Sequence, residues 1–496
     1  MPLVLALDQG TTSSRAIVFD EVGEKRSQAQ VPLPQIFPKP GWVEQDPIVM
    51  WENQLQVARE AIGAAGVTAA DLSAIGITNQ RETVVVWDRA TGTPLYNAIV
   101  WQDRRTAEVC DALIRSGVAP RVRAKTGLPV DPYFSATKIA WILDNVPNAR
   151  VRAERGELAC GTVDTWFIWQ LTGGDVHVTD STNASRTLLY DIERGCWDEE
   201  LLALFGVPAE LLPLVVPSSG VMGTTRPELL GAAVPIGSAC GDQQASLAGN
   251  GGFAPGDAKA TFGTGVFALM HTGTERAVSE TLAVTVAAQT SERLEYALEG
   301  SIFMGGAVVQ WIVEGLKLAD SPQAAQALAE SVSDSNGVVL VPALTGLGAP
   351  EWDPLARGAI FGLTRGATDA HVARAAMESI PLQVSDLINA MSEDSGRGLA
   401  SIRVDGGVTV NALVMQTLAD VLGIPVDVAQ MAESTALGAA YLAGLATGVW
   451  SGPQDLPMLV GVARTFEPDP GAAPRLADLR LRWAEAVRRS LKWERE

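Results

Sequence analysis

The amino-acid sequence predicts an α/β protein that consists of two large domains. Short apolar runs, which indicate strands, alternate with longer segments of helical periodicity, and this alternation is typical of α/β organisation. A strand, a tight turn of small residues and a second strand occur twice, once at the N-terminus and once near the middle of the chain. The length of 496 residues exceeds what one hydrophobic core usually supports, so we expect two.

The apolar patterns predict the main elements of each half. For the first half we expect strands at residues 3–7, 16–19, 74–78 and 83–87 and a helix at 47–65. For the second half we expect strands at 258–262, 266–270, 338–342 and 401–404 and helices at 369–391 and 409–422.

The domain boundary and the C-terminal helix have signals of their own. Glycines cluster at residues 249–252, so we place the boundary there and expect domains at 1–249 and 250–496. A predicted C-terminal helix carries an apolar stripe that is suited to docking on its own domain, formed by Leu476, Leu479, Trp483 and Val487.

The composition argues against several classes of protein. The net charge of −20 disfavours a protein that holds nucleic acid or an anionic membrane by its overall field. No stretch is long and apolar enough to span a membrane and the N-terminus has no signal-peptide pattern, so we expect a cytoplasmic protein. The four cysteines and three histidines are scattered, which indicates neither a disulfide framework nor a zinc site.

The first strand ends in a carboxylate and a turn of small hydroxyl residues, Asp8-Gln9-Gly10-Thr11-Thr12-Ser13-Ser14-Arg15. Such a carboxylate is able to serve Mg²⁺, and the backbone N–H groups of the turn are able to approach phosphate oxygens. An ordinary hairpin turn explains the same residues equally well. The second half repeats the pattern at Gly263-Thr264-Gly265, as an internally duplicated, ATP-clamping fold requires.

A second group of motifs is suited to binding a small polyol. Arg81 and Glu82 interrupt two apolar strands, and they are able to donate to hydroxyl oxygens and to accept hydroxyl protons. A solvated turn is the alternative for this pair. Trp101 is suited to the carbon side of a polyol, although a lone Trp is more often part of a core. Tyr133 lies in a loop and is free to face a ligand.

Neighbouring charges in these motifs have plainer explanations. Arg104 and Arg105 are expected on an exposed helix start, and Lys138 is expected to be a surface or interdomain charge.

Two further motifs concern the chemistry of the site. Asp242 stands between a predicted strand and a helix, a position that suits a general base, and its alternative role is that of a helix N-cap. Gly406 and Gly407 allow close backbone approach, and Asn411 is expected on the first turn of the following helix, where it is able to bind adenine and ribose.

Taken together, the motifs resemble those of the FGGY carbohydrate kinases, and most closely those members that phosphorylate glycerol. The resemblance spans nearly the whole chain and is most specific at residues 79–82. The similar stretches are 8–15, 78–83, 101–105, 241–244, 263–265 and 405–411, with two broader family signatures at 133–145 and 358–378.

The resemblance implies a fold and an activity. It implies two actin-like (ribonuclease H-like) ATPase domains around an interdomain catalytic cleft, with glycerol held mainly by the first domain and ATP mainly by the second. The implied reaction is ATP-dependent phosphorylation of glycerol to sn-glycerol 3-phosphate, the entry step of glycerol catabolism, with Mg²⁺ as cofactor. It also leads us to expect a homo-oligomer, a dimer or a tetramer.

Matching positions imply individual roles. The polyol would contact Arg81, Glu82, Trp101, Tyr133, Asp242, Gln243 and Phe267. The nucleotide would be surrounded by Thr11, Thr12, Ser13, Arg15, Thr264, Gly306, Gln310, Gly407 and Asn411. Asp8 and Asp242 would hold Mg²⁺, and Asp242 would act as the general base.

Three other functions share part of this pattern. An actin- or Hsp70-like ATPase would have both phosphate turns but no polyol pocket. A silent sugar-binding regulator would keep the pocket but is expected to lack Asp8 or Asp242, and both are present. The nearest alternative is an FGGY kinase that acts on a longer polyol or a ketose.

Overall fold

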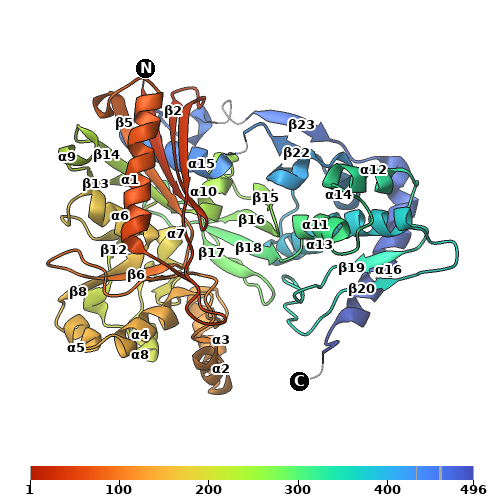
Figure 1. Ribbon diagram of the computed structural model, residues 1–496, viewed down its shortest axis with the longest axis horizontal. Coiled ribbons are helices and arrows are strands. Elements are labelled where there is room, and N and C mark those ends of the chain that lie inside the picture. The colour runs from red at the N-terminus through yellow and green to blue at the C-terminus, as the bar shows by residue number, and fades with distance from the viewer. Residues whose placement is uncertain (1, 432, 457–460, 495–496) are drawn as a thin grey trace.

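A computed structural model describes residues 2–431, 433–456 and 461–494. Each half of the chain builds one large mixed sheet, and the two halves lie side by side (Figure 1). The first sheet has the strand order β13-β14-β5-β1-β2-β3. Its strands are β1 (Leu3–Gln9), β2 (Ser13–Asp20), β3 (Lys25–Pro32), β5 (Leu72–Asn79), β13 (Ser219–Thr224) and β14 (Pro235–Gly241).

The second sheet repeats the topology of the first. Its order is β17-β18-β16-β15-β21-β22-β23. In both sheets an antiparallel hairpin, β1-β2 or β15-β16, is followed by two parallel strands on its other side. The expected duplicated, actin-like α/β architecture is therefore confirmed. The strands are β15 (Ala258–Phe262), β16 (Val266–Gly273), β17 (Ala283–Val286), β18 (Tyr296–Ile302), β21 (Ile402–Asp405), β22 (Val426–Ala429) and β23 (Val462–Phe466).

Smaller sheets and the helices complete the molecule. A four-stranded sheet in the first half contains β4 (Glu44–Gln45), β7 (Ala98–Ile99), β6 (Val84–Asp88) and β8 (Leu158–Thr162). Three strand pairs are formed by β9 (Val178–Asp180) with β12 (Leu214–Val216), β10 (Tyr190–Asp191) with β11 (Cys196–Trp197), and β19 (Val339–Val341) with β20 (Ala359–Phe361). The first-half helices are α1 (Pro47–Ala64), α2 (Ala107–Arg115), α3 (Ala119–Thr126), α4 (Ser135–Asn145), α5 (Ala149–Glu154), α6 (Val163–Leu171), α7 (Ser181–Ala184), α8 (Glu199–Phe205), α9 (Pro227–Leu230) and α10 (Asp242–Gly249). The second-half helices are α11 (Gly306–Glu314), α12 (Pro322–Glu330), α13 (Asp369–Ser395), α14 (Ala412–Leu422), α15 (Ser434–Thr447) and α16 (Ala473–Ser490).

Strand β1 is buried on both faces, which explains its unbroken apolar run. Leu5 and Leu7 share a core with residues of α1, whereas Val4 and Ala6 share a different core with residues of α15. Side chains of a strand alternate between the two faces of the sheet, so α1 covers one face and α15 the other. Helix α15, drawn in blue, lies among the first-half elements in Figure 1, although it belongs to the second half of the sequence.

Helices α10 and α15 cross at two glycines. A Cβ atom on Gly438 would lie 1.8 Å from the carbonyl oxygen of Ala245, and one on Gly249 would lie 1.8 Å from that of Ser434. No side chain fits in such a space, so only glycine permits this approach of the two backbones. The crossing joins α10, which follows the first sheet, to the helix that the second half contributes to that sheet.

Most predicted elements of the two sheets are confirmed, and one helix begins later than expected. Residues 407–410 form a 3₁₀ turn instead of the start of the helix predicted at 409–422. Gly406 has φ +97°, and a Cβ atom there would lie 2.4 Å from the carbonyl oxygen of Phe262, so the chain needs glycine where it leaves β21. Asn411 is consequently the N-cap of α14, with its Oδ1 accepting from the N–H of Val414 at 3.1 Å, and not a residue of the first turn.

The remaining composition-based expectations concern the C-terminal stripe, the cysteines and membrane spans. Leu476, Leu479, Trp483 and Val487 are all buried, so α16 docks on its own domain as predicted. All four cysteines are free thiols. None of the helices in the described part of the chain has the length and apolar composition that a membrane span requires.

Candidate active site

The turn between β1 and β2 is a tight hairpin. The N–H of Gly10 donates to the carbonyl oxygen of Ser13 at 3.0 Å, and Thr12 is exposed. Asp8, one residue before the end of β1, is buried, and its Oδ2 lies 3.3 Å from Nη2 of Arg15. Burial raises the pKa of Asp8, an effect that the Arg15 guanidinium opposes. The alternative interpretation, an ordinary hairpin turn, is therefore correct for the backbone geometry. The same turn leaves exposed small residues beside a carboxylate.

The turn between β15 and β16 has the same form in the second half. The N–H of Gly263 donates to the carbonyl oxygen of Gly265 at 2.9 Å, and Gly263 and Thr264 are exposed. The N–H groups of Gly305 and Gly306 donate to the carbonyls of Thr264 and Gly263, both at 2.8 Å. The start of α11 therefore holds this turn in place.

The other second-half residues with a predicted nucleotide role gather around this turn. A Cβ atom on Gly306 would lie 3.1 Å from a methyl group of Val408, the residue after Gly407, so α11 and the 407–410 turn are in contact. Gly407 is exposed, and Asn411 caps α14 directly behind it. Gln310 is exposed one helical turn beyond Gly306 and donates to Glu314 at 3.1 Å. The structure thus brings together residues from three separate stretches of sequence.

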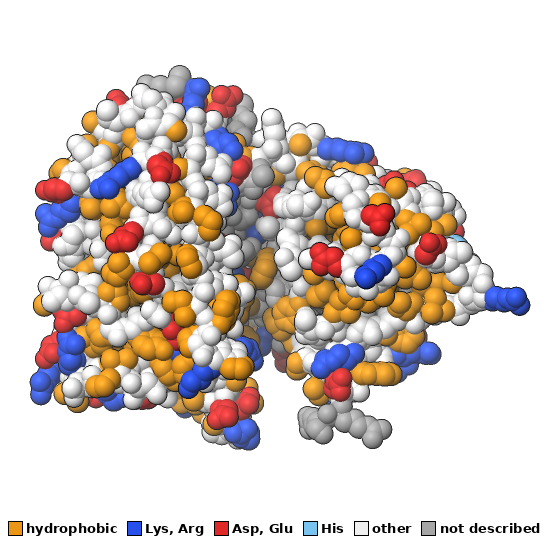
Figure 2. All heavy atoms as spheres, viewed as in Figure 1, with side chains coloured by type: hydrophobic (Ala, Val, Ile, Leu, Met, Phe, Trp, Pro, Cys, Tyr) orange, Lys and Arg blue, Asp and Glu red, His pale blue; other side chains and the backbone are white. Residues whose placement is uncertain are grey.

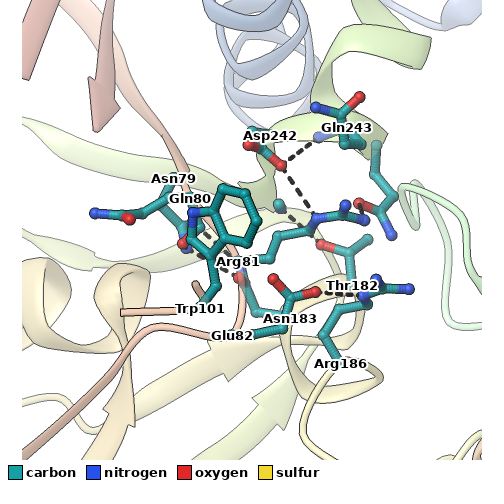
Figure 3. Close-up of polar contacts among 12 residues, drawn as sticks. Asn79, Gln80, Arg81, Glu82, Trp101, Thr182, Asn183, Arg186, Asp242 and Gln243 are labelled. Carbon is teal, nitrogen blue, oxygen red and sulfur yellow. Dashed lines mark hydrogen bonds and ion pairs between the residues drawn. The ribbon is translucent and has the colours of Figure 1, made fainter. Parts of the chain in front are cut away.

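Asp242 lies where β14 passes into α10, as expected. The N-cap position is held by Gly241, so Asp242 is the first residue of the helix and its alternative role as N-cap is wrong. Its Oδ1 lies 3.1 Å from Nε of Arg81 and accepts the N–H of Gln243 at 2.8 Å (Figure 3). About a third of the side chain, 32%, remains exposed. Burial raises the pKa of Asp242, whereas Arg81 and Lys259 act to lower it.

Arg81 and Glu82 are buried, with 3% and 1% of their surface exposed, so the alternative of a solvated turn is wrong. Glu299 holds the Arg81 guanidinium with both carboxylate oxygens, and Arg186 donates from Nε to Glu82 Oε1 at 2.6 Å. Burial raises the pKa of Glu82, against the lowering effect of Arg186. Figure 3 shows Arg81, Glu82 and Asp242 gathered in one place, with Trp101 on one side.

Two aromatic residues with a predicted polyol role also meet. The rings of Trp101 and Tyr133 pack edge to face, with centroids 5.4 Å apart. Trp101 donates from Nε1 to Oγ1 of Thr11 at 2.9 Å, which links the polyol group to the first hairpin turn. Both side chains are half-buried, so Trp101 is not the core residue that its type more often is.

Phe267 and Gln243 complete the predicted set from the second half and from α10. Phe267 lies opposite Thr261 in the β15-β16 ladder, which places both side chains on the same face of the sheet as Lys259. Lys259 donates from Nζ to Oε1 of Gln243 at 2.6 Å and to Thr261 at 2.9 Å. This face of the second sheet is therefore directed at the start of α10, where Asp242 lies.

Two of the three expectations about neighbouring charges need correction. Arg105 is not an exposed helix-start residue, because its side chain is fully buried between Asp103 and Glu44. Arg104 is exposed as expected. Lys138 is not a surface or interdomain charge: it is buried and donates to the carbonyls of Pro132, Tyr133 and Phe134 at 2.6, 2.6 and 3.0 Å. It thereby fixes the loop that carries Tyr133, and burial lowers its pKa to about 8.

Sequence reasoning missed three charged residues of this site. Arg186, Glu299 and Lys259 all lie within the buried network around Arg81 and Gln243. A signal was present for Lys259 and Glu299, because each is a charge inside an apolar strand and so requires a partner. Arg186 follows the short helix α7 and had no such signal.

A hollow separates the two halves (Figure 2), and the residues described above come from both of its sides. The site combines a Gly/Thr turn from each half, Asp8 near the end of β1, Asp242 directly after β14, and a buried cluster of charges.

Comparisons with known proteins give one consistent result. Residues 3–249 match the N-terminal domain, and residues 258–447 the C-terminal domain, of the FGGY family of carbohydrate kinases. The chain is 56% identical over 496 residues to a glycerol kinase of Polaromonas sp. strain JS666, with 99% of this chain and 100% of the relative covered. It is 55% identical over 494 residues to a glycerol kinase of Trichlorobacter lovleyi, with 99% of each covered.

Solved structures agree. A crystal structure of Plasmodium falciparum glycerol kinase with ADP has a TM-score of 0.94 at 35% identity, covering 99% of this chain and 98% of that one. A ligand-bound xylulose kinase from Lactobacillus acidophilus has a TM-score of 0.91 at 22% identity, covering 99% and 98%, and shows the shared fold. On these matches, and on the duplicated fold that carries them, the chain belongs to the FGGY family of carbohydrate kinases.

Proposed function

We propose that the protein transfers the γ-phosphoryl group of ATP to a terminal hydroxyl of glycerol, giving sn-glycerol 3-phosphate and ADP. The contact between Arg81 and Asp242 carries the proposal, because it joins a group suited to binding hydroxyls to a group suited to deprotonating one. The relatives named glycerol kinase at 55–56% identity support the choice of substrate. In this role the enzyme performs the entry step of glycerol catabolism.

The polyol site is proposed to lie mainly on the first half, residues 1–249. Arg81, Glu82 and Tyr133 are proposed to contact the hydroxyls. Asp242, beside Arg81, and Gln243 are proposed to do so from α10, and the ring of Tyr133 is held against Trp101. Trp101 and Phe267 are proposed to flank the carbon chain. All of these side chains except Phe267 belong to the first half.

The nucleotide is proposed to bind mainly to the second half, residues 250–496. The 263–265 turn, which the start of α11 holds in place, is proposed to offer backbone N–H groups for phosphate, and the 407–411 segment is proposed to hold adenine and ribose. The first hairpin contributes from the opposite side. The proposed contacts are Thr11, Thr12, Ser13, Arg15, Thr264, Gly306, Gln310, Gly407 and Asn411.

The donor set fits Mg²⁺ bound through water. Asp8 is in register with Thr78 of β5, and Thr78 with Cys240 of β14, so Asp8 and the end of β14 lie at the same edge of the sheet, two strands or about 10 Å apart. Mg²⁺ in kinases keeps several waters and takes one or two carboxylates together with phosphate oxygens, which matches Asp8 and Asp242. When bound, the ion would neutralise charge on the transferred phosphoryl group.

Asp242 is proposed to act as the general base. Its carboxylate accepts the proton of the terminal hydroxyl while that oxygen attacks the γ-phosphorus, and the bond to the β-phosphate oxygen of ADP breaks. Arg81 holds Oδ1 from one side, and the N–H of Gln243 also donates to it. The two turns place N–H groups where negative charge develops on the phosphoryl oxygens.

A panel of substrates tests the proposed function. We expect ATP-dependent phosphorylation to be fastest with glycerol among glycerol, dihydroxyacetone, erythritol and xylulose, measured by coupled ADP release and by identification of the product. In the absence of a polyol, ADP release is expected to be far slower, because closure of the two halves excludes water. Best activity on a five-carbon sugar would contradict the choice of substrate. ATP hydrolysis as fast as the kinase reaction would contradict closure.

Lys138 provides a second, more local prediction. Lys138→Met keeps most of the side-chain volume but removes three hydrogen bonds to the loop of Tyr133. We expect the KM for glycerol to rise about tenfold, which corresponds to a loss of about 1.4 kcal/mol of binding free energy, because the Tyr133 loop is less well ordered. The KM for ATP is expected to change less than about twofold. Steady-state kinetics measure both. Lys125→Met, which removes a lysine paired with Asp198, is the control and is expected to change neither value.

A further inference from the structure

Five buried or half-buried charges form one chain of alternating sign across the boundary between the halves. The order is Glu82, Arg186, Glu299, Arg81 and Asp242. Arg186 lies 2.6 Å from Glu82 and 3.1 Å from Glu299. Arg81 lies 2.5 Å from Glu299 through Nη1, 3.0 Å from it through Nη2, and 3.1 Å from Asp242 through Nε. The first, fourth and fifth members, Glu82, Arg81 and Asp242, are proposed to grip the polyol, and Arg186 and Glu299 connect Glu82 to Arg81.

Glu299 is the member that comes from the second half. It lies on β18, opposite Leu269 of β16, which in turn lies opposite Lys259 of β15. The three therefore share the face of the second sheet that is directed at α10. Only 5% of Glu299 is exposed, and although burial acts to raise its pKa, the guanidiniums of Arg186 and Arg81 lower that pKa to about 2. It is thus ionised at any working pH.

Hydrogen bonds and an ion pair leave little freedom to the guanidinium of Arg81. Its Nε pairs with Asp242, and its Nη1 donates to both Glu299 and Gln244. Its Nη2 donates to Glu299. A planar guanidinium held at two nitrogens by one carboxylate has a fixed plane, and so fixed directions for its remaining N–H groups. By the count of five donors, one N–H on Nη2 of Arg81 stays available for a ligand.

Arg186 has a similar position on Glu82. Its Nε and Nη2 are used by Glu82 and Glu299, whereas its buried Nη1 has no partner within the described residues. Glu82 has φ +61°, in the left-handed region that residues other than glycine rarely adopt. The hydrogen bond from Arg186 therefore holds the carboxylate of a residue whose backbone conformation is uncommon.

We propose that Glu299 and Arg186 are positioning residues of the polyol site, Glu299 by fixing the plane of Arg81 and Arg186 by fixing the carboxylate of Glu82. The proposal rests on the proposed function, since it assigns Arg81 and Glu82 to the polyol. Its consequence is that the site formed by the first half is complete only when β18 of the second half lies against it. Polyol affinity then depends on a side chain that is remote in sequence from every polyol motif.

Glu299→Gln tests the proposal. The amide is nearly isosteric and keeps one oxygen for Nη2 of Arg81 and Nη2 of Arg186, but it is neutral. Its NH2 group would face Nη1 of Arg81, where the carboxylate now accepts, so the two-point hold on the Arg81 guanidinium is lost. We expect the KM for glycerol to rise about 10- to 100-fold and the KM for ATP to change less than about threefold. Titration with glycerol in the absence of nucleotide is expected to show the same loss of affinity. Arg186→Lys keeps the charge without the fork and is expected to raise the KM for glycerol as well.

A matched control separates positioning from stability. Glu378 is also a buried glutamate between two arginines, Arg374 and Arg475, each at 2.8 Å, but it lies on α13. Glu378→Gln is expected to lower the melting temperature as Glu299→Gln does and to leave the KM for glycerol unchanged. A glycerol KM raised equally in both variants would overturn the proposal.

The conservative change gives a second readout. Glu299→Asp keeps the charge but shortens the side chain by one methylene, so it is expected to raise the KM for glycerol less than Glu299→Gln does. If Glu299→Gln does not fold, an unchanged glycerol KM in Glu299→Asp overturns the proposal, and a rise of about threefold or more supports it. Absence of glycerol phosphorylation by the unmodified protein would instead contradict the proposed function.

Discussion

Asp242→Asn is expected to lower the turnover of glycerol by about 10² or more while glycerol binding stays within a few-fold. The amide oxygen is able to keep both contacts of the carboxylate, with Nε of Arg81 and with the N–H of Gln243. The geometry of the polyol site should therefore persist. An amide does not take up a proton from the attacking hydroxyl, so the loss falls on the chemical step.

Two measurements distinguish this result from general damage. Single-turnover kinetics report the chemical step, and titration with glycerol in the absence of nucleotide reports binding. Asp175→Asn, at a surface pair with Arg226, is the matched control and is expected to retain normal turnover. Near-normal turnover in folded Asp242→Asn would remove Asp242 as the base.

Gly438→Ala is expected to destabilise the protein by about 3 kcal/mol and to impair catalysis. The new methyl group would lie 1.8 Å from the carbonyl oxygen of Ala245, a backbone atom that has no rotamer with which to move away. Helix α15 must then shift away from α10 by about 1 Å or more to reach ordinary contact. Because α10 begins at Asp242, the same shift displaces the proposed base.

The experiment compares melting temperature and turnover with those of Gly63→Ala. Gly63 is also a helical glycine, near the end of α1, but a Cβ atom there would meet nothing within 4 Å. This control is expected to be neutral or slightly stabilising, because alanine has the higher helix propensity. Equal melting temperatures for the two variants would show that the α10-α15 crossing tolerates a side chain.

The sequence predicted the two sheets well, because their strands carry a direct local signal. Residues 3–7 are apolar on both faces, residues 258–262 are apolar on one face, and a tight Gly/Thr turn follows each strand. The start of α14 was misplaced because Thr409 and Val410 fit a helical pattern, whereas the geometry at Gly406 and the cap at Asn411 delay the helix. Helix caps and left-handed turns depend on tertiary contacts, here the contact of Gly406 with the end of β15.

The candidate site could be predicted only where its residues form short motifs. Arg81, Glu82 and Asp242 stand next to strands and attract attention as polar interruptions, and the structure brings all three together. Burial of Lys138 and Arg105 could not be predicted, because a long basic side chain within a motif reads as a surface charge until its carbonyl or carboxylate partners are placed. Arg186 and Glu299 are separated from Arg81 by 105 and 218 residues, so only the fold shows the pairing.

The position of α15 on the first sheet also determines how late in synthesis that sheet can be completed. One face of that sheet, with Val4, Ala6 and Ala74, is covered by Ala440 and Tyr441, which the ribosome adds about 200 residues after β14 is finished. At about 5–20 residues per second, an apolar surface stays uncovered for about 10–40 s. During that interval the first half is expected to expose an aggregation-prone apolar face, and a fragment that stops at residue 249 is expected to keep that face exposed.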